Sequence, residues 1–359
     1  MSSKGKAVVA MSGGVDSSVA AALMLEEGWQ PVGVTLKLMP RQPALIGCCG
    51  SSSDIDDAKR VCEELGIAHY TLDLSILFED RVIRPFVDSY LAARTPNPCV
   101  ECNRSLKFGF LLSLAEAWGA ACVATGHYAR VEDSRLWRAK DAEKDQSYFL
   151  YSLTRRELGR VRFPLGDLRK TEVRRRALAL GLKTAAKPDS QEICFVGGGD
   201  YRGFIKSRLG GGSRPASLKP GPIKDAAGRE LGRHGGLAFY TVGQRKGLGG
   251  GLGGRRYVVE LEPETNTLVV GGSADVFCSR LTAGGVSWTV SAPQGARRAE
   301  VRIRHGHVPA PAVIRPLDGD RVSVAFDEPQ RAVTRGQAAV FYSGDEVLGG
   351  GTIVSRENV

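Results

Sequence analysis

Residues 10–17 (Ala-Met-Ser-Gly-Gly-Val-Asp-Ser) have the composition of an anion-binding turn. They follow a short apolar run that predicts a strand, and a helix-forming run from Ser18 to Glu27 comes directly after them. Glycines let the backbone approach phosphate oxygens, and the N–H groups and dipole at a helix N-terminus favour negative charge. The hydroxyl groups of Ser12, Ser17 and Ser18 are further donors. We therefore predict that this loop binds phosphate, the alternative being an ordinary turn from strand to helix.

Two other phosphate-binding motifs are absent from this loop. The segment has no GxxxxGK[ST] string, so it offers no lysine to a β- and γ-phosphate pair, and it has no GxGxxG string of the dinucleotide-binding type. Its Ser-Gly-Gly-x-Asp-Ser string resembles the PP-loop of the N-type ATP pyrophosphatases. These enzymes cleave ATP between its α and β phosphates and adenylate a substrate, so the resemblance implies ATP as the ligand.

Three of the eight cysteines lie in polar, loop-like contexts where thiol chemistry is expected. Cys99 and Cys102 are spaced C-x-x-C on a turn stiffened by prolines, just before a predicted helix from Ser105 to Trp118. A helix N-terminus lowers the pKa of a nearby thiol and so favours the nucleophilic thiolate. Cys194 is distant in sequence but is a candidate reaction partner for the pair. A redox-silent pair or half of a zinc site is the alternative, although no two further ligands follow at short spacing.

Other polar strings are weaker signals. Gly126 ends an apolar run, where a nucleotide can rest against backbone, and the adjacent His127 is by default a structural residue held by hydrogen bonds. Residues 144–146 place a cation, a carboxylate and an amide in one turn, which alone predicts only a solvated helix start. The basic segments at 174–176, 234–247 and 302–305 suit RNA phosphates, although most charge runs simply face solvent.

The elements that must position these residues alternate between strand and helix over the first ~190 residues, which predicts a mainly parallel sheet with helices on both faces. The loop at Ser12 and the turn at Gly126 both follow predicted strands, and the carboxyl ends of strands are where such sheets bind ligands. Beyond residue 196 the composition changes to glycine-rich turns and short alternating runs. That pattern predicts a small β domain followed by a β-barrel.

Composition limits the class of protein. The chain has 359 residues and a net charge of +10, with 49 Lys and Arg against 39 acidic residues, which is the electrostatic signature of a polyanion binder. No run approaches the roughly 18 apolar residues of a membrane helix, and the start of the chain is not that of a signal peptide. We therefore expect a cytoplasmic protein that binds nucleic acid and no membrane. Cys62, Cys122 and Cys278 are expected to be inert thiols rather than parts of a disulfide framework.

The ordered strings resemble, over essentially the whole chain, the tRNA-specific 2-thiouridylase family, which replaces the C2 oxygen of the wobble uridine by sulfur. The strings are SGGVDSS, TPNPxxxCN, ATGHY, KDQSYFL, DSxxICF, HxGxxxxTxGQRKGL and TxGQxAVFY. The resemblance implies an α/β fold with a parallel-sheet PP-loop domain, a small central domain and a C-terminal β-barrel that grips tRNA. The boundaries that we predict are 1–196, 197–272 and 273–359.

The same resemblance implies roles for individual residues. ATP, with Mg²⁺, is expected on Ala10, Met11, Ser12, Gly13, Gly14, Val15, Asp16 and Ser17, with Leu36 beside the adenine and Gly126 against the nucleotide. Cys102 matches the nucleophile that delivers sulfur, and Cys194 matches the cysteine that receives it as a persulfide from a cysteine-desulfurase-derived donor or relay protein. The residues that match tRNA contacts are Asn97, Pro98, Cys99, His127, Lys144, Asp145, Gln146, Arg304, His305 and Gln337.

One departure from the family pattern concerns Cys99, where aspartate is usual. Cysteine at this position raises a second scheme, in which Cys99, Cys102 and Cys194 hold three irons of a 4Fe–4S cluster that delivers sulfide. The persulfide scheme is favoured because two cysteines then explain the chemistry without another cofactor.

Two other functions remain open from the sequence. An amidotransferase-type PP-loop ligase would need a glutaminase segment, and none is apparent. A non-catalytic RNA-binding protein would not need an intact phosphate loop together with intact thiols.

Overall fold

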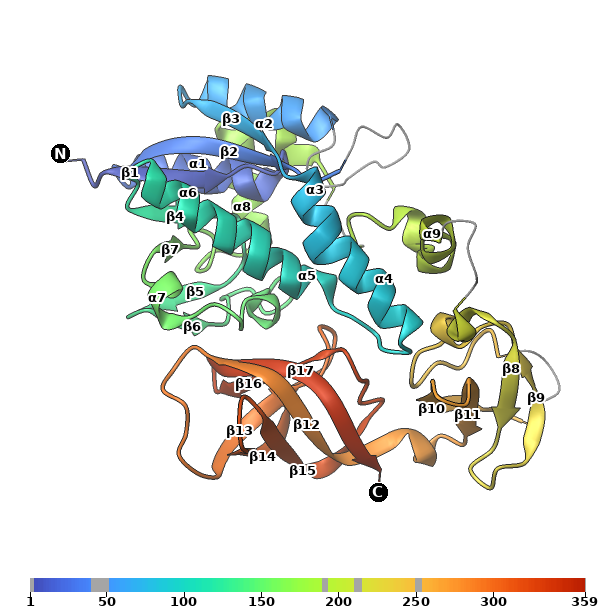
Figure 1. Ribbon diagram of the computed structural model, residues 1–359. Helices are drawn as coiled ribbons and strands as arrows, with labels where there is room; N and C mark the ends of the chain where they lie inside the picture. The colour runs from blue at the N-terminus through green and yellow to red at the C-terminus, as the bar shows by residue number, and fades with distance from the viewer. Residues whose placement is uncertain (1–2, 40–51, 189–192, 210–214, 249–253, 359) are drawn as a thin grey trace.

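The computed structural model describes residues 3–39, 52–188, 193–209, 215–248 and 254–358 (Figure 1). Within these ranges the chain forms a parallel sheet covered by helices, a small mixed sheet and an antiparallel barrel. A screen of these same ranges finds no helix with the length and apolar character needed to cross a membrane.

A five-stranded parallel sheet positions the phosphate loop. Its order is β3 (His69–Asp73), β2 (Gln30–Lys37), β1 (Lys6–Ala10), β4 (Cys122–Ala124) and β7 (Val161–Arg162). β1 lies in the middle, with β2 on one side and β4 on the other, so the direction of strand order reverses there. The predicted alternation of strands and helices is confirmed, and the loops after β1 and β4 meet at the carboxyl edge, where such sheets bind ligands.

Helices cover both faces of this sheet, as Figure 1 shows. On one face, α1 (Val15–Glu26), α2 (Ser52–Glu64) and α8 (Lys170–Ala179) share a buried core that includes Val19, Cys62 and Ala177. The other face is covered by α3 (Ser75–Phe78), η1 (Glu79–Ile83), α4 (Arg84–Leu91), α5 (Pro98–Glu101), η2 (Cys102–Phe110) and α6 (Leu111–Ala117). The short helix α7 (Arg155–Leu158) begins with a capping box, in which the N-cap Thr154 and Glu157 of the first turn exchange hydrogen bonds.

The helix predicted from Ser105 begins earlier than expected. α5 opens at Pro98, and η2 continues it with π-helical hydrogen bonding into α6. Pro98 does not break the helix, because a proline in the first turn has no need of its missing N–H. Cys99 therefore lies in the first turn, while Cys102 lies one turn later and is buried. The prediction that both thiols precede the helix is wrong.

The later part of the chain is mostly β structure, as predicted. After α9 (Tyr201–Arg208), a four-stranded sheet has the order β10 (Tyr257–Glu262), β11 (Thr267–Gly271), β8 (Gly221–Lys224) and β9 (Glu230–His234). The barrel comprises β12 (Phe277–Trp288), β13 (Arg297–Arg302), β14 (Ala310–Pro316), β15 (Val322–Arg331), β16 (Ala338–Ser343) and β17 (Glu346–Asn358). Pairing between β12 and β17 closes it.

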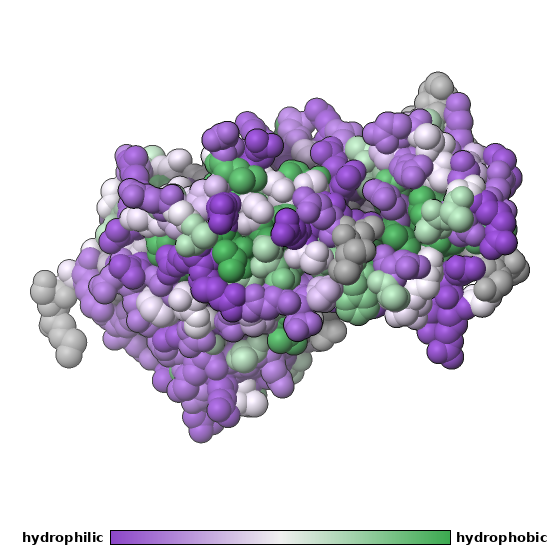
Figure 2. Space-filling model, turned by 90° about the horizontal axis from the view of Figure 1, so that it is seen from below, coloured by the Kyte–Doolittle hydropathy of each residue, from purple (hydrophilic) through white to green (hydrophobic). Residues whose placement is uncertain are grey.

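The three parts share contacts rather than standing apart. The hairpin β5 (Arg130–Glu132) and β6 (Arg135–Trp137) belongs to the first part of the chain, yet β6 pairs with β17 of the barrel at Leu136 and Val347. One hydrophobic core runs from Phe86 in α4 to Leu268 in the small sheet and Tyr342 in the barrel. Seen from below, the surface is mostly hydrophilic, with hydrophobic side chains in scattered patches (Figure 2).

Candidate active site

The phosphate loop joins β1 to α1 with a backbone that only glycine permits at residue 13. Gly13 has a φ of +73°, and a Cβ on it would lie 2.2 Å from the carbonyl oxygen of Asp54. Gly14 is the N-cap of α1 and has no side-chain cap. The backbone N–H groups at this helix N-terminus are therefore presented without a competing side chain, as anion binding requires.

The loop serines behave differently from one another. The Ser17 hydroxyl donates to the Gly14 carbonyl at 3.0 Å and accepts from the Ser12 backbone N–H at 3.1 Å. The buried Ser18 hydroxyl also donates to the Gly14 carbonyl, at 2.9 Å. Ser17 and Ser18 thus hold the shape of the loop, while Ser12 alone of the three is exposed. The expectation that all three hydroxyls are donors to phosphate does not hold for Ser17 and Ser18, whose protons go to the Gly14 carbonyl.

The two more distant residues predicted for the nucleotide lie at the same sheet edge. A Cβ on Gly126 would lie 2.7 Å from the Asp16 carbonyl carbon and 2.8 Å from the Ser17 nitrogen, so the turn after β4 touches the loop itself. Leu36 is buried near the end of β2, the strand on the other side of β1. Both positions are compatible with the nucleotide contacts implied by the resemblance.

Two lysines that the sequence analysis missed reach this loop. Lys170, at the start of α8, places Nζ 2.7 Å from Oδ2 and 2.8 Å from Oδ1 of Asp16, and the Tyr128 hydroxyl donates to Oδ1 at 2.8 Å. Lys187 places Nζ 3.0 Å from the Gly13 carbonyl oxygen. These lysines stand 154 and 174 residues from their partners along the chain, so no local pattern could have identified them.

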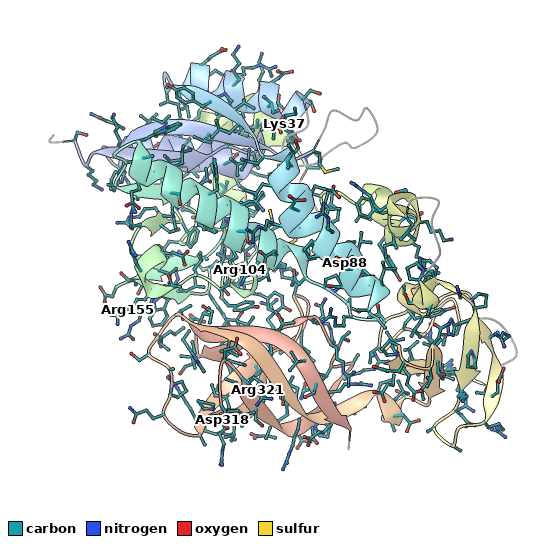
Figure 3. The ribbon with its side chains drawn as sticks, viewed as in Figure 1. Lys37, Asp88, Arg104, Arg155, Asp318 and Arg321 are labelled. Atoms are coloured by element: carbon teal, nitrogen blue, oxygen red, sulfur yellow. The ribbon has the colours of Figure 1, made fainter. Side chains whose placement is uncertain are left out.

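The loop that precedes Cys102 is fixed by contacts from other parts of the chain. The Thr95 N–H donates to the Arg335 carbonyl at 2.9 Å, and the Thr95 hydroxyl donates to that of Thr241 at 3.2 Å. Gln337 Nε2 donates to the carbonyls of Thr95 and Pro96 at 3.1 and 3.2 Å. α5 and η2 carry Cys99 and Cys102 and together form the thiol-bearing helix. Arg104, labelled on this helix in Figure 3, lies on the side that faces the barrel.

The turn at residues 144–149 links the thiol-bearing helix to the barrel. Asp145 is only 5% exposed; it accepts hydrogen bonds from the Ala139 and Ser147 N–H groups and lies 3.4 Å from the Arg302 guanidinium. The Gln146 side chain accepts from the Tyr128 N–H at 3.0 Å. Asp145 and Gln146 therefore hold the turn in place, and their contact with tRNA stays a prediction, as does that of the partly exposed Lys144.

An aromatic stack stands where this turn meets the barrel. The rings of Phe149 and His305 are 4.6 Å apart and nearly parallel, at 26°. Asn103 Nδ2 donates to the Phe149 carbonyl at 3.2 Å, which ties the stack to the helix of Cys102. Arg304, beside His305, donates to the Arg331 carbonyl at 3.0 Å, and burial together with Arg331 lowers its pKa.

His127 is a neutral residue in this environment. Its Nδ1 lies 2.7 Å from the Thr125 hydroxyl, and its ring contacts Phe108 and Phe163. Burial, with a smaller effect of Lys107, lowers the pKa of His127 well below its ordinary value. These contacts are compatible with the structural interpretation of His127, and the ring is no cation for phosphate near neutral pH; its contact with tRNA stays a prediction.

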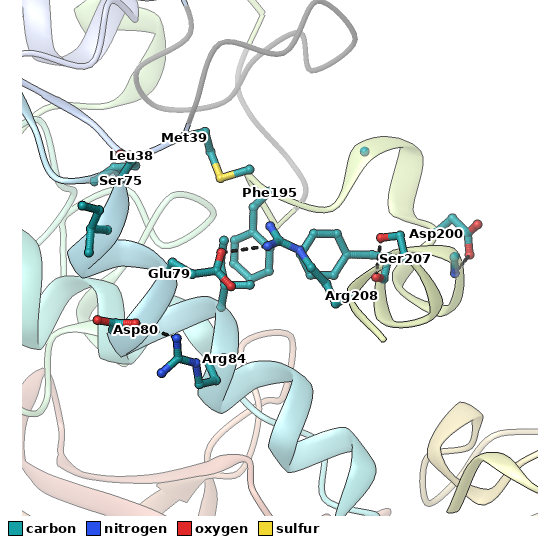
Figure 4. Close-up of a pocket in the computed structure, with 15 residues that line it drawn as sticks. Leu38, Met39, Ser75, Glu79, Asp80, Arg84, Phe195, Asp200, Ser207 and Arg208 are labelled. Carbon is teal, nitrogen blue, oxygen red and sulfur yellow. Dashed lines mark hydrogen bonds and ion pairs between the residues drawn. The ribbon is translucent and has the colours of Figure 1, made fainter. Parts of the chain in front are cut away.

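Cys194 lies in a different setting from Cys102. It is partly exposed and packs against the core that contains Cys102, and the adjacent Phe195 lines a groove of about 970 Å³ between α3–α4 and α9 (Figure 4). An ion pair of 2.9 Å between Glu79 and Arg208 crosses this groove. The first part of the DSxxICF string, at 189–192, lies outside the described residues.

The described residues contain no group of three or more His, Cys, Asp or Glu side chains placed to hold a metal ion, and Cys99, Cys102 and Cys194 are all among them. This finding concerns a single ion, whereas the cysteines of a 4Fe–4S cluster each bind a different iron, so the cluster scheme on these three thiols stays a prediction.

Comparisons with known proteins match the chain along its length. Three domain models align in order: a tRNA methyl transferase HUP domain over residues 5–198, a tRNA methyl transferase PRC-barrel domain over 213–272 and an aminomethyltransferase beta-barrel domain over 278–353. The tRNA-specific 2-thiouridylase MnmA of Heliobacterium modesticaldum is 50% identical, with 97% of this chain and 92% of that protein covered. The protein of the same name from Carboxydothermus hydrogenoformans is 48% identical, with 98% of this chain and 98% of that protein covered. The one from Moorella thermoacetica is 50% identical, with 97% of this chain and 99% of that protein covered.

Proposed function

The chain belongs to the tRNA-specific 2-thiouridylase family, and on this premise we propose how its residues share the reaction. Its parallel-sheet HUP domain uses ATP, its middle domain is PRC-barrel-like, and its C-terminal domain is a six-stranded β-barrel. The enzyme is a tRNA-specific 2-thiouridylase, with the wobble uridine as the base that it modifies. The observation that supports the assignment of roles is the contact between the barrel and the loop that precedes the helix of Cys99 and Cys102, made by Gln337 with Thr95 and Pro96.

The first step is activation of a poor electrophile. The uridine O2 attacks the α-phosphate of ATP, pyrophosphate leaves, and C2 then carries AMP as its leaving group in place of oxide. Residues 10–17 hold the triphosphate, with Gly126 against the nucleotide and Leu36 at the adenine side. The base must leave the anticodon stack to react. Asn97, at the N-cap of α5, and Pro98 and Cys99, in its first turn, are the residues that we assign to contact with the base.

Mg²⁺ fits the donor set at the loop, because this ion takes one or two carboxylates together with substrate phosphates. Asp16 is the carboxylate that would hold it, since among the described residues its Oδ2 accepts only the bond from Lys170, whereas Oδ1 accepts from both Lys170 and Tyr128. When bound, the ion would neutralise the negative charge that develops on the departing pyrophosphate.

The second step is delivery of sulfur. A cysteine-desulfurase-derived donor or relay protein leaves a persulfide on Cys194, which is partly exposed. The Cys102 thiolate attacks the inner sulfur of that persulfide, hydrosulfide is released to attack C2, and AMP departs with loss of one proton. Cys102 and Cys194 end as a disulfide, which an external thiol must reduce before the next turnover.

Sulfide delivery by a 4Fe–4S cluster on Cys99, Cys102 and Cys194 is the alternative. Two cysteines explain the chemistry without another cofactor, so no step above passes through a cluster.

Thiolation assays on anaerobically purified protein test the assignment. Cys102→Ala and Cys194→Ala are expected to abolish 2-thiouridine formation, whereas Cys99→Ala and the buried control Cys122→Ala should retain it. The wild-type protein should be colourless, and a Cys102–Cys194 disulfide should be trapped after one turnover. Brown protein that contains iron and sulfide, and that loses both colour and activity in Cys99→Ala, would instead establish the cluster scheme.

A further inference from the structure

Lys187 is bonded to the phosphate loop and to the helix beside it. Its Nζ lies 3.0 Å from the Gly13 carbonyl oxygen, 2.6 Å from Oδ1 of Asp54 and 2.8 Å from Oδ2 of Asp57. The side chain is 27% exposed. Although burial alone would lower it, the two carboxylates raise the pKa of Lys187 above its ordinary value, so this side chain remains a cation.

The bond to Gly13 fixes the orientation of a peptide group. In a planar trans peptide, the C=O of one residue and the N–H of the next point in opposite directions. Because the Gly13 carbonyl points at Lys187, the Gly14 N–H points away from Lys187. Glycine lacks the Cβ that restrains other residues, so this peptide needs an outside contact to keep one orientation.

The same cation offsets negative charge next to the phosphate site. Asp54 and Asp57 lie near the first turn of α2, and the close approach of Gly13 to Asp54 brings them against the loop. Uncompensated carboxylates beside the loop would repel a bound triphosphate. Lys187 bridges both of them, and Arg60 also pairs with Asp57 at 3.2 Å, so two cations offset the two carboxylates.

The backbone that carries Lys187 is itself held in place. Arg174 of α8 donates to the carbonyls of Ala185 and Lys187, at 2.8 and 3.1 Å. The Thr184 hydroxyl donates to that of Ser18 at 3.2 Å, within α1. The segment that carries Lys187 is thus hydrogen-bonded to both α1 and α8. Support of this kind is needed to position a loop accurately.

We propose that Lys187 is a positioning residue of the ATP site. It fixes the Gly13–Gly14 peptide and offsets the negative charge of Asp54 and Asp57, so that the loop keeps one backbone conformation before the triphosphate binds. This lysine takes the structural place of the motif lysine that the loop lacks, but it acts through the backbone of the loop. The inference rests on the proposed assignment of residues 10–17 to ATP.

Equilibrium binding of ATP to the full-length protein tests this role without reference to turnover. Lys187→Met is expected to weaken ATP binding by about tenfold or more, because it removes a charge-assisted hydrogen bond to the loop and the cation that Asp54 and Asp57 share. Binding of tRNA should stay within about twofold of wild type, since the predicted tRNA residues lie elsewhere. Lys187→Arg, which keeps the charge, should be intermediate. Lys183→Met is the matched control, because Lys183 is exposed on the same segment.

ATP affinity of Lys187→Met equal to that of Lys183→Met would overturn the proposal. If Lys187→Met does not fold, as judged by its melting curve, Lys187→Arg decides: ATP affinity reduced severalfold supports the proposal, and wild-type affinity overturns it. Asp16→Ala separates this inference from its premise. If Asp16→Ala retains AMP formation, the assignment of the ATP site itself is wrong. If Asp16→Ala loses AMP formation but Lys187→Met binds ATP like wild type, the assignment of the loop stands and the proposed role of Lys187 is wrong.

Discussion

At the scale of single residues, the site is organised by carboxylates and cations that face one another across the phosphate loop. Asp16 lies in the first turn of α1, where the helix dipole stabilises its negative charge. Tyr128 and Lys170 hold both of its oxygens, so the carboxylate has one orientation before any ligand arrives. An oriented charge of this kind needs no rearrangement at the moment of reaction.

Replacement of Asp16 by alanine should therefore abolish chemistry and spare RNA binding. We expect formation of AMP and pyrophosphate to fall about 10²-fold or more, the usual cost of losing one preorganised charge contact. The affinity for tRNA should stay within about twofold, because the predicted tRNA residues lie on other elements. Radiolabelled ATP hydrolysis and filter binding measure the two quantities. Asp56→Ala, at an exposed position of α2, is the control; thiolation by Asp16→Ala at the wild-type rate would refute the assignment of this loop.

At the scale of elements, the loop ahead of Cys102 is supported by the barrel rather than by its own helix. A Cβ on Gly336 would lie 2.8 Å from the Thr95 carbonyl oxygen, and the φ of Gly336 is +93°, so the barrel backbone touches this loop where only glycine fits. Gln337 then satisfies two of the loop's carbonyls. The thiol and the barrel therefore keep a fixed relation to each other.

Gln337→Glu tests this support, because it preserves shape while replacing the donating amide by a carboxylate that faces two carbonyl oxygens. We expect the thiolation rate at saturating tRNA to fall about tenfold, since unsatisfied buried acceptors cost about 1–3 kcal/mol and each 1.36 kcal/mol is a factor of ten in rate. ATP affinity, measured by equilibrium binding, should be unchanged. Gln294→Glu, at an exposed barrel position, controls for added charge. A Gln337→Glu enzyme with the wild-type rate would show that the loop positions itself.

At the scale of the whole molecule, the net charge of +10 comes from lysine and arginine alone. Burial lowers the pKa values of all five histidines, which are His69, His127, His234, His305 and His307. Histidine thus adds no positive charge near neutral pH. The attraction for a polyanion is carried by groups that do not titrate in this range.

The affinity for tRNA should consequently depend steeply on salt, with each phosphate contact adding about 0.7–0.9 to the log–log slope. Arg304→Ala is expected to weaken binding and to flatten that slope by about one contact. Arg298→Ala is the matched control, because Arg298 is an exposed barrel arginine already paired with Asp327 at 2.6 Å. Titrations at several salt concentrations give both slopes, and equal slopes for the two variants would place the tRNA surface away from Arg304.

Much of this protein follows from local sequence. Turn chemistry identifies the phosphate loop at Gly13 and Gly14, because the conformation of a tight turn depends on a few adjacent residues. Hydrophobic periodicity predicts the alternating strands and helices, since each period reports which side of an element is buried. The ordered strings around Cys102, Cys194 and Gln337 indicate the family, which the comparisons confirm.

Only the tertiary structure decided which distant residues serve the site. Lys170 and Lys187 reach the loop across 154 and 174 residues, and Gln337 reaches Thr95 across 242. The start of the thiol-bearing helix at Pro98 agrees with the local preference of proline for the first turn, whereas the burial of Cys102 depended on packing against the core. Contacts of this kind arise from how sheets, helices and barrel pack together, and no short window of sequence contains both partners.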